Sequence, residues 1–475
     1  MRAVVGTSRS RPARRSRIAA LLVLGLAAAG LAACGGGSSS AQSSPTTPAA
    51  GSTSSSPSAL PSQLPPQTLT FGVIGGPDEV AAYEQMASLF APLNRQVRVK
   101  VEHWPDAGAM VQAFAEGRPV PDVFLSTRRY LPSLLEHQQI QPVDQLLDER
   151  GVDFGDSYPR STLTAFAVDN QLTCLPYGIQ PTVVFYNKQL VKLGRIPQAP
   201  ATPGQGWSFD QFTSAARWAV NHHEGTTGMY VDPSIAGVSP FLYSGGGQLF
   251  DNASRPTTTA FASGANQQTL GRLTRTLRRP HMTLTAAQLA RMTPAEWFES
   301  GKLAMLEGTR QLVPALRQHA QLDFDVMPVP TLSSSATTGG LSGICLSKHP
   351  RDVGTAADFL VYASSPDALS SVASAGYLQP ANQTVALSDA FQQPGHLPRH
   401  AGVFTFSVKS MVFLPLLNTW DALDAVVDPR LVELLGGRPS AVPRRARQAD
   451  RASRPVLAPP QSAPSSAPSS ASSPG

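Results

Sequence analysis

The chain has 475 residues, 38 of them basic and 32 acidic, so its net charge is +6 and its pI is about 9.4. Six of the basic residues lie within the first 33 residues, where no acidic residue is found; they are Arg2, Arg9, Arg11, Arg14, Arg15 and Arg17. Without that segment the remaining 32 basic residues balance the 32 acidic ones, which excludes the electrostatic footprint of a nucleic-acid-binding protein.

The first 33 residues have the plan of a bacterial export signal. A basic patch that ends at Arg17 precedes the almost entirely apolar run of residues 18–33. A transmembrane helix is the alternative, but about 16 apolar residues fall short of the roughly 20 that span a bilayer. The tetrapeptide LAAC, which ends at Cys34, resembles a lipobox, where a lipoprotein precursor is cleaved and its new N-terminal cysteine is acylated. We therefore predict a signal peptide over residues 1–33 and a lipid anchor on Cys34.

Two segments that flank the body of the chain are predicted to be disordered. Residues 34–67 are mostly Ser, Pro, Gly, Thr and Ala, and they cannot bury enough apolar area to fold. Such a tether of about 33 residues has a typical reach of about 30 Å. The tail, residues 446–475, ends in a similar tract of Pro, Ser and Ala. About 380 residues remain between these segments, which is enough for two domains.

Strand and helix patterns alternate along this body and favour an α/β architecture. Strands are predicted at residues 69–76, 97–104 and 121–126, and each is followed by apolar residues at helical spacing. Ligands of α/β proteins bind at the loops that follow such strands. These loops are predicted at residues 75–78, 104–106 and 126–129, and they supply the candidate contacts Asp78, Trp104, Ser126 and Arg128. Turn chemistry is the alternative for Asp78, and packing is the alternative for Trp104.

Several segments resemble, in the same order, the family 1 extracellular solute-binding proteins of bacterial ABC importers, a group that includes sugar-binding lipoproteins. The resemblance covers residues 68–445 and rests on short motifs. These are the segments 117–147 with Pro-Asp-Val, 175–191 with Tyr-Asn-Lys, WSFDQFTSAARWAV (207–220), FESGKLAMLEGTR (298–310), 339–368 with the return at 376–381, and WDALDAVVDPRLVELLGGRPS (420–440).

The resemblance implies an α/β fold of the type II periplasmic-binding-protein kind, with two lobes joined by hinge strands and a ligand cleft between them. Lobe 1 is expected at residues 68–176 and 346–380, and lobe 2 at 177–345 and 381–445. Residues 176–181 form the expected first crossing, because two prolines in six residues disfavour an ordinary central strand. The apolar run TVVFY that follows is predicted to be a buried strand of lobe 2.

The same resemblance supplies the other candidate ligand contacts, which are Tyr177, Gln180, Gly246, Arg310, Tyr377 and Trp420. A simple loop is the alternative for Tyr177 and Gln180, and packing is the alternative for each aromatic residue. Gly246 lies in SGGGQLF, which lacks the Gly-Lys-Ser/Thr of a phosphate loop. Sugar binders often carry an aromatic near the position of Arg310, so this chain departs from the family there. An arginine can instead bind vicinal hydroxyls or a carboxylate with two hydrogen bonds.

Two cysteines, Cys174 and Cys345, remain once Cys34 is assigned to the lipid. An exported protein folds in an oxidising setting, where such a pair is expected to be bridged. In the resembling family the two crossing strands run side by side and antiparallel, which implies that these cysteines face each other on the lobe 1 side of the hinge. Two buried free thiols are the alternative.

These features predict capture of a sugar or oligosaccharide on the outer face of the membrane and its delivery to the permease subunits of an ABC transporter. A lipid-anchored solute sensor is the alternative, and a surface glycosidase is a weaker one. The nucleophile-elbow pattern fails at Ser342, because Ile344 stands where a glycine is needed. His222 and His223 are adjacent, so they cannot chelate a metal together. We predict a monomer without catalytic residues, metal, cofactor or nucleic-acid partner.

Overall fold

The computed structural model describes residues 67–94, 96–196 and 203–458, which all lie in one compact unit, residues 63–475. The predicted signal peptide, Cys34 and nearly all of the predicted tether lie outside the described residues, as do residues 459–475 of the predicted tail. Within the described ranges, no helix is both long and apolar enough to cross a membrane.

The first lobe is built on a six-stranded sheet with the order β2-β1-β3-β11-β4, in which β7 also pairs with β11. Its strands are β1 (Gln67–Ile74), β2 (Val97–Trp104), β3 (Val123–Thr127), β4 (Ile140–Gln141), β7 (Cys174–Pro181) and β11 (Gly339–Ser347). β1 is parallel to β2 and β3, whereas β11 is antiparallel to all its partners. The three strands predicted near residues 69, 97 and 121 are therefore confirmed, and they form the parallel half of this sheet.

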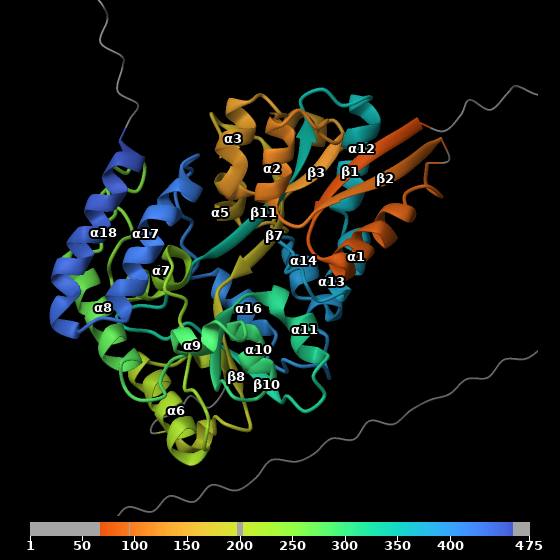
Figure 1. Cartoon of the computed structure of the whole chain (residues 1–475). Helices are drawn as coiled ribbons and strands as arrows, with labels where there is room; N and C mark the ends of the chain where they lie inside the picture. Colours follow the sequence, from red (N-terminus) through yellow and green to blue (C-terminus); the bar gives the residue numbers. More distant parts are fainter. Residues whose placement is uncertain (1–66, 95, 197–202, 459–475) are drawn as a thin grey trace, which may run out of the picture. The chain divides into compact units, whose positions relative to one another are not determined.

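Helices cover the first sheet, as parallel strand connections require (Figure 1). They are α1 (Pro77–Ser88), α2 (Ala107–Ala115), η1 (Arg128–Tyr130), α3 (Leu131–Glu136), α4 (Asp144–Asp148), α5 (Arg160–Ala165), α12 (Val353–Ala363) and α13 (Pro366–Ser374). A two-stranded ribbon of β5 (Ala167–Val168) and β6 (Gln171–Leu172) precedes β7. The side chain of Asp106 accepts a hydrogen bond from the amide of Ala109 and so fixes the start of α2 directly after β2.

The second lobe contains a three-stranded antiparallel sheet with the order β10-β8-β9. Its strands are β8 (Val183–Asn187), β9 (Met305–Gly308) and β10 (Phe324–Pro328). Its helices are α6 (Phe209–His222), α7 (Ile235–Ser244), α8 (Gly264–Leu277), α9 (Ala286–Leu289), α10 (Pro294–Glu299), η4 (Arg310–Leu312), α11 (Val313–Arg317), α16 (Gly402–Val408), α17 (Trp420–Leu435) and α18 (Val442–Leu457). All five residues of β8 are buried, as predicted for TVVFY.

The hinge between the two sheets consists of β7 and β11, which pair in antiparallel register from Gly339 opposite Pro181 to Cys345 opposite Cys174. A register shift beside Gly343 interrupts the ladder. A side chain at Gly343 would meet the Phe166 ring at 2.8 Å and Cys174 Cβ at 3.0 Å, so the close approach of these strands requires glycine there. The predicted crossing strands are confirmed.

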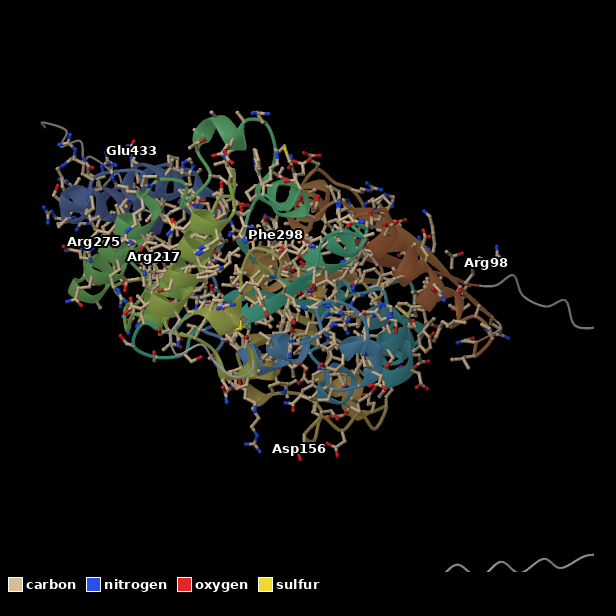
Figure 2. The ribbon with its side chains drawn as sticks, turned by 90° about the horizontal axis from the view of Figure 1, so that it is seen from below. Arg98, Asp156, Arg217, Arg275, Phe298 and Glu433 are labelled. Atoms are coloured by element: carbon tan, nitrogen blue, oxygen red, sulfur yellow. A yellow bond between two sulfur atoms is a disulfide. The ribbon has the colours of Figure 1, made fainter. Side chains whose placement is uncertain are left out.

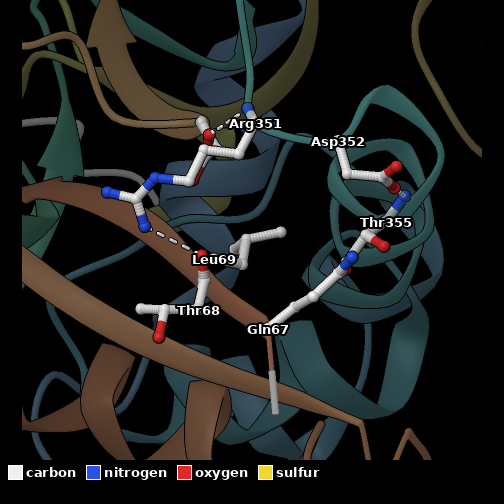
Figure 3. A pocket seen from close by; sticks show the side chains of 7 residues that line it. Gln67, Thr68, Leu69, Arg351, Asp352 and Thr355 are labelled. Carbon is white, nitrogen blue, oxygen red and sulfur yellow. Dashed lines mark hydrogen bonds between the residues drawn. The ribbon is translucent and has the colours of Figure 1, made fainter. Parts of the chain in front are cut away.

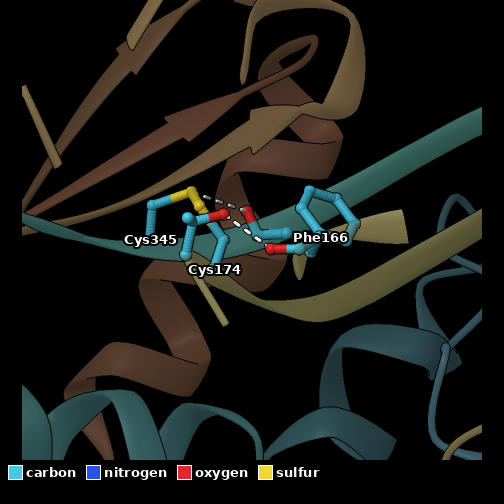
Figure 4. Close-up of a disulfide and its surroundings, with 5 residues drawn as sticks. Phe166, Cys174 and Cys345 are labelled. Carbon is cyan, nitrogen blue, oxygen red and sulfur yellow. Dashed lines mark hydrogen bonds between the residues drawn. A yellow bond between two sulfur atoms is a disulfide. The ribbon is translucent and has the colours of Figure 1, made fainter. Parts of the chain in front are cut away.

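A disulfide joins Cys174 and Cys345 across these strands, with 4.4 Å between the two Cα atoms (Figure 4). The two cysteines are buried and lie where β11 also pairs with β3, so both sulfurs belong to the first lobe. The predicted pairing and its position are thus confirmed in the structure.

Two predicted boundaries differ from the structure. The tail predicted to begin at residue 446 is helical as far as Leu457, because α18 packs on α8 and α17 (Figure 1). Small residues allow this close packing, and Asp450 accepts hydrogen bonds from the amides of Phe261 and Ala262. Residues 381–392, predicted to belong to lobe 2, form α14 (Gln383–Ala386) and α15 (Asp389–Gln392), which pack against α13 of lobe 1.

Candidate functional site

Two adjacent cavities lie between the lobes, on the side of the hinge where η1 meets the start of α17. The first has a volume of about 320 Å³ and is lined by Arg128 and Arg129 of lobe 1, by Thr338–Leu341 of the hinge, and by residues of lobe 2 that include Ala236, Thr309 and Trp420. The second has a volume of about 520 Å³ and is lined by α2, η1 and the residues around Trp420. Arg129 and Trp420 line both cavities and therefore form the partition between them.

Arg129 connects the lobes at this partition. Its Nη2 donates to a carboxylate oxygen of Asp421 and, at 2.7 Å, to one of Asp424. Its guanidinium also lies over the Trp420 ring, with 5.6 Å from Cζ to the ring centroid. The Arg129 side chain is 33% exposed and that of Asp421 is 68% exposed, so water screens this bridge. The contact can therefore break at low cost.

Arg128 lies beside Arg129 and has no carboxylate partner in the described structure. Its Nε donates to the carbonyl of Ala165 at 2.7 Å, and its Nη1 donates to the carbonyl of Leu414. Burial lowers the pKa of Arg128 to about 10, which still leaves the side chain charged at neutral pH. The lobe 1 wall of the cavities therefore carries two adjacent cations.

Lobe 2 carries the opposite charge beside Arg129. Asp421, Asp424 and Asp428 follow one another on α17 at spacings of three and four residues, which places them along one face of the helix. Asp428 accepts a hydrogen bond from the amide of Ile235, the first residue of α7, at 2.8 Å. Burial, with the nearby charge of Asp424, raises the pKa of Asp428 to about 6. Burial also raises the pKa of Asp424, although Arg129 opposes this effect.

The acidic wall continues from α17 to β9. Asp232, an exposed residue before α7, lies close enough to influence both Asp428 and Glu307. Both carboxylate oxygens of Glu307 are buried without a well-formed hydrogen bond to any described residue. Burial raises the pKa of Glu307 well above its ordinary value, Asp232 adds to the effect, and the Asp232 amide offsets only part of it. We call Asp232, Glu307, Asp421, Asp424 and Asp428 the acidic wall. Of these residues, Asp421 lines the second cavity.

Other cavities lie away from this region. One, of about 170 Å³, opens beside the start of β1, where Arg351 donates to the Thr68 carbonyl (Figure 3). This is the amino end of the parallel strands, whereas α/β sheets bind ligands at the carboxyl ends. Another, of about 290 Å³, lies between α6 and α8 and is lined by arginines that include Arg217 and Arg275 (Figure 2). Only residues of lobe 2 line it, so lobe closure would not enclose a ligand there.

The comparison with protein families gives a match over residues 80–399 to the model described as bacterial extracellular solute-binding protein. The chain belongs to the bacterial extracellular solute-binding protein family. No curated protein matches the sequence of this solute-binding protein. Among its described residues, no group of three or more His, Cys, Asp or Glu side chains is arranged to hold a metal ion.

Many solved structures share the fold of this solute-binding protein. The ABC substrate-binding protein Lmo0181 from Listeria monocytogenes, in complex with cycloalternan, is 19% identical with a TM-score of 0.69, over 82% of this chain and 98% of that one. The GacH receptor of Streptomyces glaucescens GLA.O is 20% identical with a TM-score of 0.66, over 83% and 99%. UgpB from Mycobacterium tuberculosis, in complex with glycerophosphocholine, is 17% identical with a TM-score of 0.66, also over 83% and 99%. The predicted two-lobed fold is confirmed.

The structure brings two of the predicted contact residues into the cavities between the lobes. Arg128 and Trp420 both line the cavity of about 320 Å³, and Trp420 donates its indole N–H to the Pro415 carbonyl at 3.2 Å. The loop predicted at residues 126–129 lies at the cavities, and the loop at 104–106 reaches the second one through Asp106. Solute contact by these residues stays a prediction.

A second group of predicted residues gathers near the hinge. Gln180 donates to the Tyr377 carbonyl at 3.0 Å, and Asp78 lies close enough to the Tyr377 hydroxyl to help burial raise its pKa. Next to Asp78, burial raises the pKa of Glu79 to about 7. Tyr177 is only 1% exposed and packs near Tyr83, so it belongs to the core of lobe 1. None of these residues lines either cavity between the lobes.

Three further candidates do not line those cavities. Trp104 is buried beneath Arg118, and Phe114 packs against its ring edge. Ser126 is buried in β3 opposite Gly343. Gly246 occupies the left-handed turn after α7 with φ of +79°, and the next residue, Gly247, packs against Asn266 of α8. Packing, the alternative for Trp104, accounts for its position.

The prediction that Arg310 presents its guanidinium to a solute is wrong. Arg310 is fully buried, and its Nε donates to the Gly376 carbonyl at 3.0 Å. Its Nη2 donates to the Phe391 carbonyl at 3.1 Å, and the Phe391 ring lies 4.7 Å from Cζ. Burial lowers the pKa of Arg310 to about 9, and the charge of Arg317 adds to this effect. The backbone turns at Gly308 and Thr309, so Thr309 faces the cavity in its place.

Residue-by-residue prediction missed the acidic wall and the partition. Arg129 stands inside a predicted ligand loop, but Arg128 is the residue of that loop predicted to contact the ligand. The acidic stripe does leave a signal, because Asp421, Asp424 and Asp428 are spaced for one helical face. The position of Arg129 opposite that stripe is a tertiary contact between residues nearly 300 positions apart, and no local pattern encodes it.

Proposed function

We propose that this protein captures a polyhydroxylated solute, a sugar or oligosaccharide, between its lobes and delivers it unchanged to the permease of an ABC transporter. The observation that carries the proposal is a cavity lined from both lobes and from the β7–β11 hinge. Lobe closure about such strands buries a solute between two walls. The solved structures named above include a complex with cycloalternan and a receptor studied with acarbose, which supports a carbohydrate.

A thermal-shift screen tests this function directly. The soluble chain from residue 35 onward is mixed with a library of mono- and oligosaccharides, polyols, organic acids and peptides. A ligand at a hundredfold excess over its Kd stabilises the folded state by about 2.7 kcal/mol, which is readily seen as a rise in Tm. A rise with a carbohydrate or polyol, with the compound recovered unchanged, supports the proposal. A rise only with a peptide or an organic acid contradicts the carbohydrate assignment, and turnover of a glycoside contradicts the binding role.

We also propose that the protein is anchored to the outer face of the cytoplasmic membrane through an acylated Cys34. The supporting sequence is the basic patch, the short apolar run and LAAC, followed by a Ser- and Gly-rich stretch. Growth with a clickable fatty acid should label the wild-type protein and fail to label Cys34→Ala, which should also be lost from the membrane fraction. Equal labelling and equal membrane retention of the variant would contradict the anchor.

A further inference from the structure

We infer that the solute proposed above carries a cationic group and that this group binds at the acidic wall of lobe 2, where the guanidinium of Arg129 now lies. This inference rests on the proposed solute-binding function and adds a chemical class to it. Two carboxylates and one indole face surround the Arg129 guanidinium. Carboxylates and aromatic faces are the groups that recognise organic cations in proteins. Lobe 2 therefore contains a complete cation site, and lobe 1 fills it with its own arginine.

The acidic wall holds more negative charge than Arg129 neutralises. Arg129 reaches Asp421 and Asp424, but it forms no ion pair with Asp428, which is held by a backbone amide. Asp232 is exposed and has no ion pair with any described residue. The neighbouring cation, Arg128, is held between the Ala165 carbonyl of lobe 1 and the Leu414 carbonyl, which precedes α17 of lobe 2. A second positive charge can therefore approach this wall without meeting a fixed cation of lobe 2.

Glu307 provides an independent observation at the same wall. Its two carboxylate oxygens are buried without a well-formed hydrogen bond to any described residue, and its nearest charged influence is Asp232. Proteins rarely leave a buried polar group without a partner, because the lost hydrogen bonds to water are not replaced. Its strand ends at Gly308, and the next residue, Thr309, lines the cavity. In the inferred complex, a donor on the cationic solute supplies a further partner for Glu307 beside the Asp232 amide.

The Arg129 bridge is suited to displacement. The Arg129 side chain is one-third exposed, and exposed ion pairs of this kind contribute only about 0–1 kcal/mol. A solute ammonium or guanidinium group brought between the lobes would replace the arginine without loss of the carboxylate and indole contacts. Arg129 then swings aside, and it is a competitor of the solute rather than one of its ligands.

The experiment removes the competitor and offers the vacated site a matched pair of fragments. Ethylguanidinium and ethylurea have nearly the same shape, but only the first is charged at neutral pH. Each is titrated into ¹⁵N-labelled Arg129→Ala, and the indole N–H signal of Trp420, assigned by its loss in Trp420→Phe, is followed by NMR. Arg129→Gln serves as a second background should the alanine variant be unstable.

We expect ethylguanidinium to shift the Trp420 signal to saturation and ethylurea to bind at least about tenfold more weakly. Asp424→Asn in the same background should weaken ethylguanidinium binding by about fivefold or more. The matched control is Arg150→Ala, which removes an arginine paired with Asp358 away from the cavities, and its Trp420 signal should respond no more strongly than that of the wild type. Equal shifts with both fragments, or no shift with either, would overturn the inference.

Failure of this inference and failure of the proposed function are separate outcomes. If neutral sugars raise Tm in the solute screen while ethylguanidinium does not bind Arg129→Ala, the solute-binding role stands and the cationic class is wrong. If no solute of any class raises Tm, the proposed function fails whatever the fragment result. In the screen, glucosamine oligomers should raise Tm more than their N-acetylated forms, which lack the charge.

Discussion

The two lobes meet at the hinge and at the cavities, and these two junctions differ in the interactions that form them. At the hinge, β7 and β11 run between the lobes and are tied on the lobe 1 side by the Cys174–Cys345 disulfide, and the buried Arg310 of lobe 2 binds the segment after α13. At the cavities, Arg129 meets Asp421 and Asp424 through partly exposed side chains. The hinge junction consists of continuous strands and buried hydrogen bonds, whereas the junction at the cavities consists of partly exposed ion pairs. A protein that opens and closes around a solute needs one junction that persists and one whose contacts can break.

The largest effect should come from removal of the disulfide at the lobe 1 end of the hinge. Replacement of both Cys174 and Cys345 by alanine removes a cross-link between positions 171 residues apart. The chain-entropy model predicts that the free energy of unfolding falls by about 5 kcal/mol. Urea denaturation followed by circular dichroism measures this change, with Cys34→Ala as the control that leaves the hinge intact. A loss below about 1 kcal/mol would show that the disulfide does not stabilise the hinge.

The buried arginine should give the next largest effect. Arg310→Met keeps much of the side-chain volume but leaves the carbonyls of Gly376 and Phe391 without their donors. Loss of these buried hydrogen bonds should lower the free energy of unfolding by about 3 kcal/mol. The matched control, Arg129→Met at the open junction, should change it by less than about 1 kcal/mol. Equal losses for the two variants would remove the distinction between the junctions.

A smaller, pH-dependent gain is expected from Asp428→Asn. Burial raises the pKa of Asp428 to about 6, so its charged form is disfavoured in the folded state and costs stability above that pH. The asparagine keeps an acceptor for the Ile235 amide, and it should stabilise the protein at pH 7.5 by about 1 kcal/mol, allowing for partial exposure of the site. The gain should vanish near pH 4, where the protonated Asp428 side chain of the folded wild type is neutral, as the asparagine side chain is. Urea denaturation at the two pH values tests this sign, and a gain at pH 4 would contradict it.

The smallest effect on stability is expected at the ionic junction itself. Arg129→Gln should lower the free energy of unfolding by less than about 1 kcal/mol at low salt. At an ionic strength of about 1 M the difference from the wild type should disappear, because the Debye length falls to about 3 Å. Paired urea titrations of Arg129→Gln and the wild type at the two salt concentrations give the difference in the free energy of unfolding at each. A loss that persists at high salt would mean that Arg129 is a structural residue like Arg310.

The comparison also separates what sequence patterns can predict from what they cannot. β2 was predicted from its alternating residues, and the hinge from its two prolines, because both signals are local. The cysteine pairing followed from the family resemblance and the positions of the two strands. The prediction that Arg310 contacts the ligand is wrong, because its position in a motif does not reveal that Gly376 and Phe391 fold over it.

The end of the chain shows a second limit. RRARQADRASRP, within residues 444–455, has the composition of a disordered tail, since it contains no large apolar residue. Its small residues Ala446, Ala449 and Ser453 nevertheless recur at spacings of three and four and are buried. Asp450 completes the contact by accepting hydrogen bonds from a loop almost 190 residues earlier. Composition misses a helix whose stability comes from such a distant partner.

The most direct test of the solute-binding account is a crystal structure of the soluble chain with whichever solute gives the largest rise in Tm. The account predicts solute density between the lobes, in contact with residues of both walls that include Arg128, Thr309 and Trp420, with Arg129 moved away from Asp424 if the solute is cationic. Density confined to the arginine-lined groove beside Arg217 and Arg275, or to the cavity beside Arg351, would contradict it.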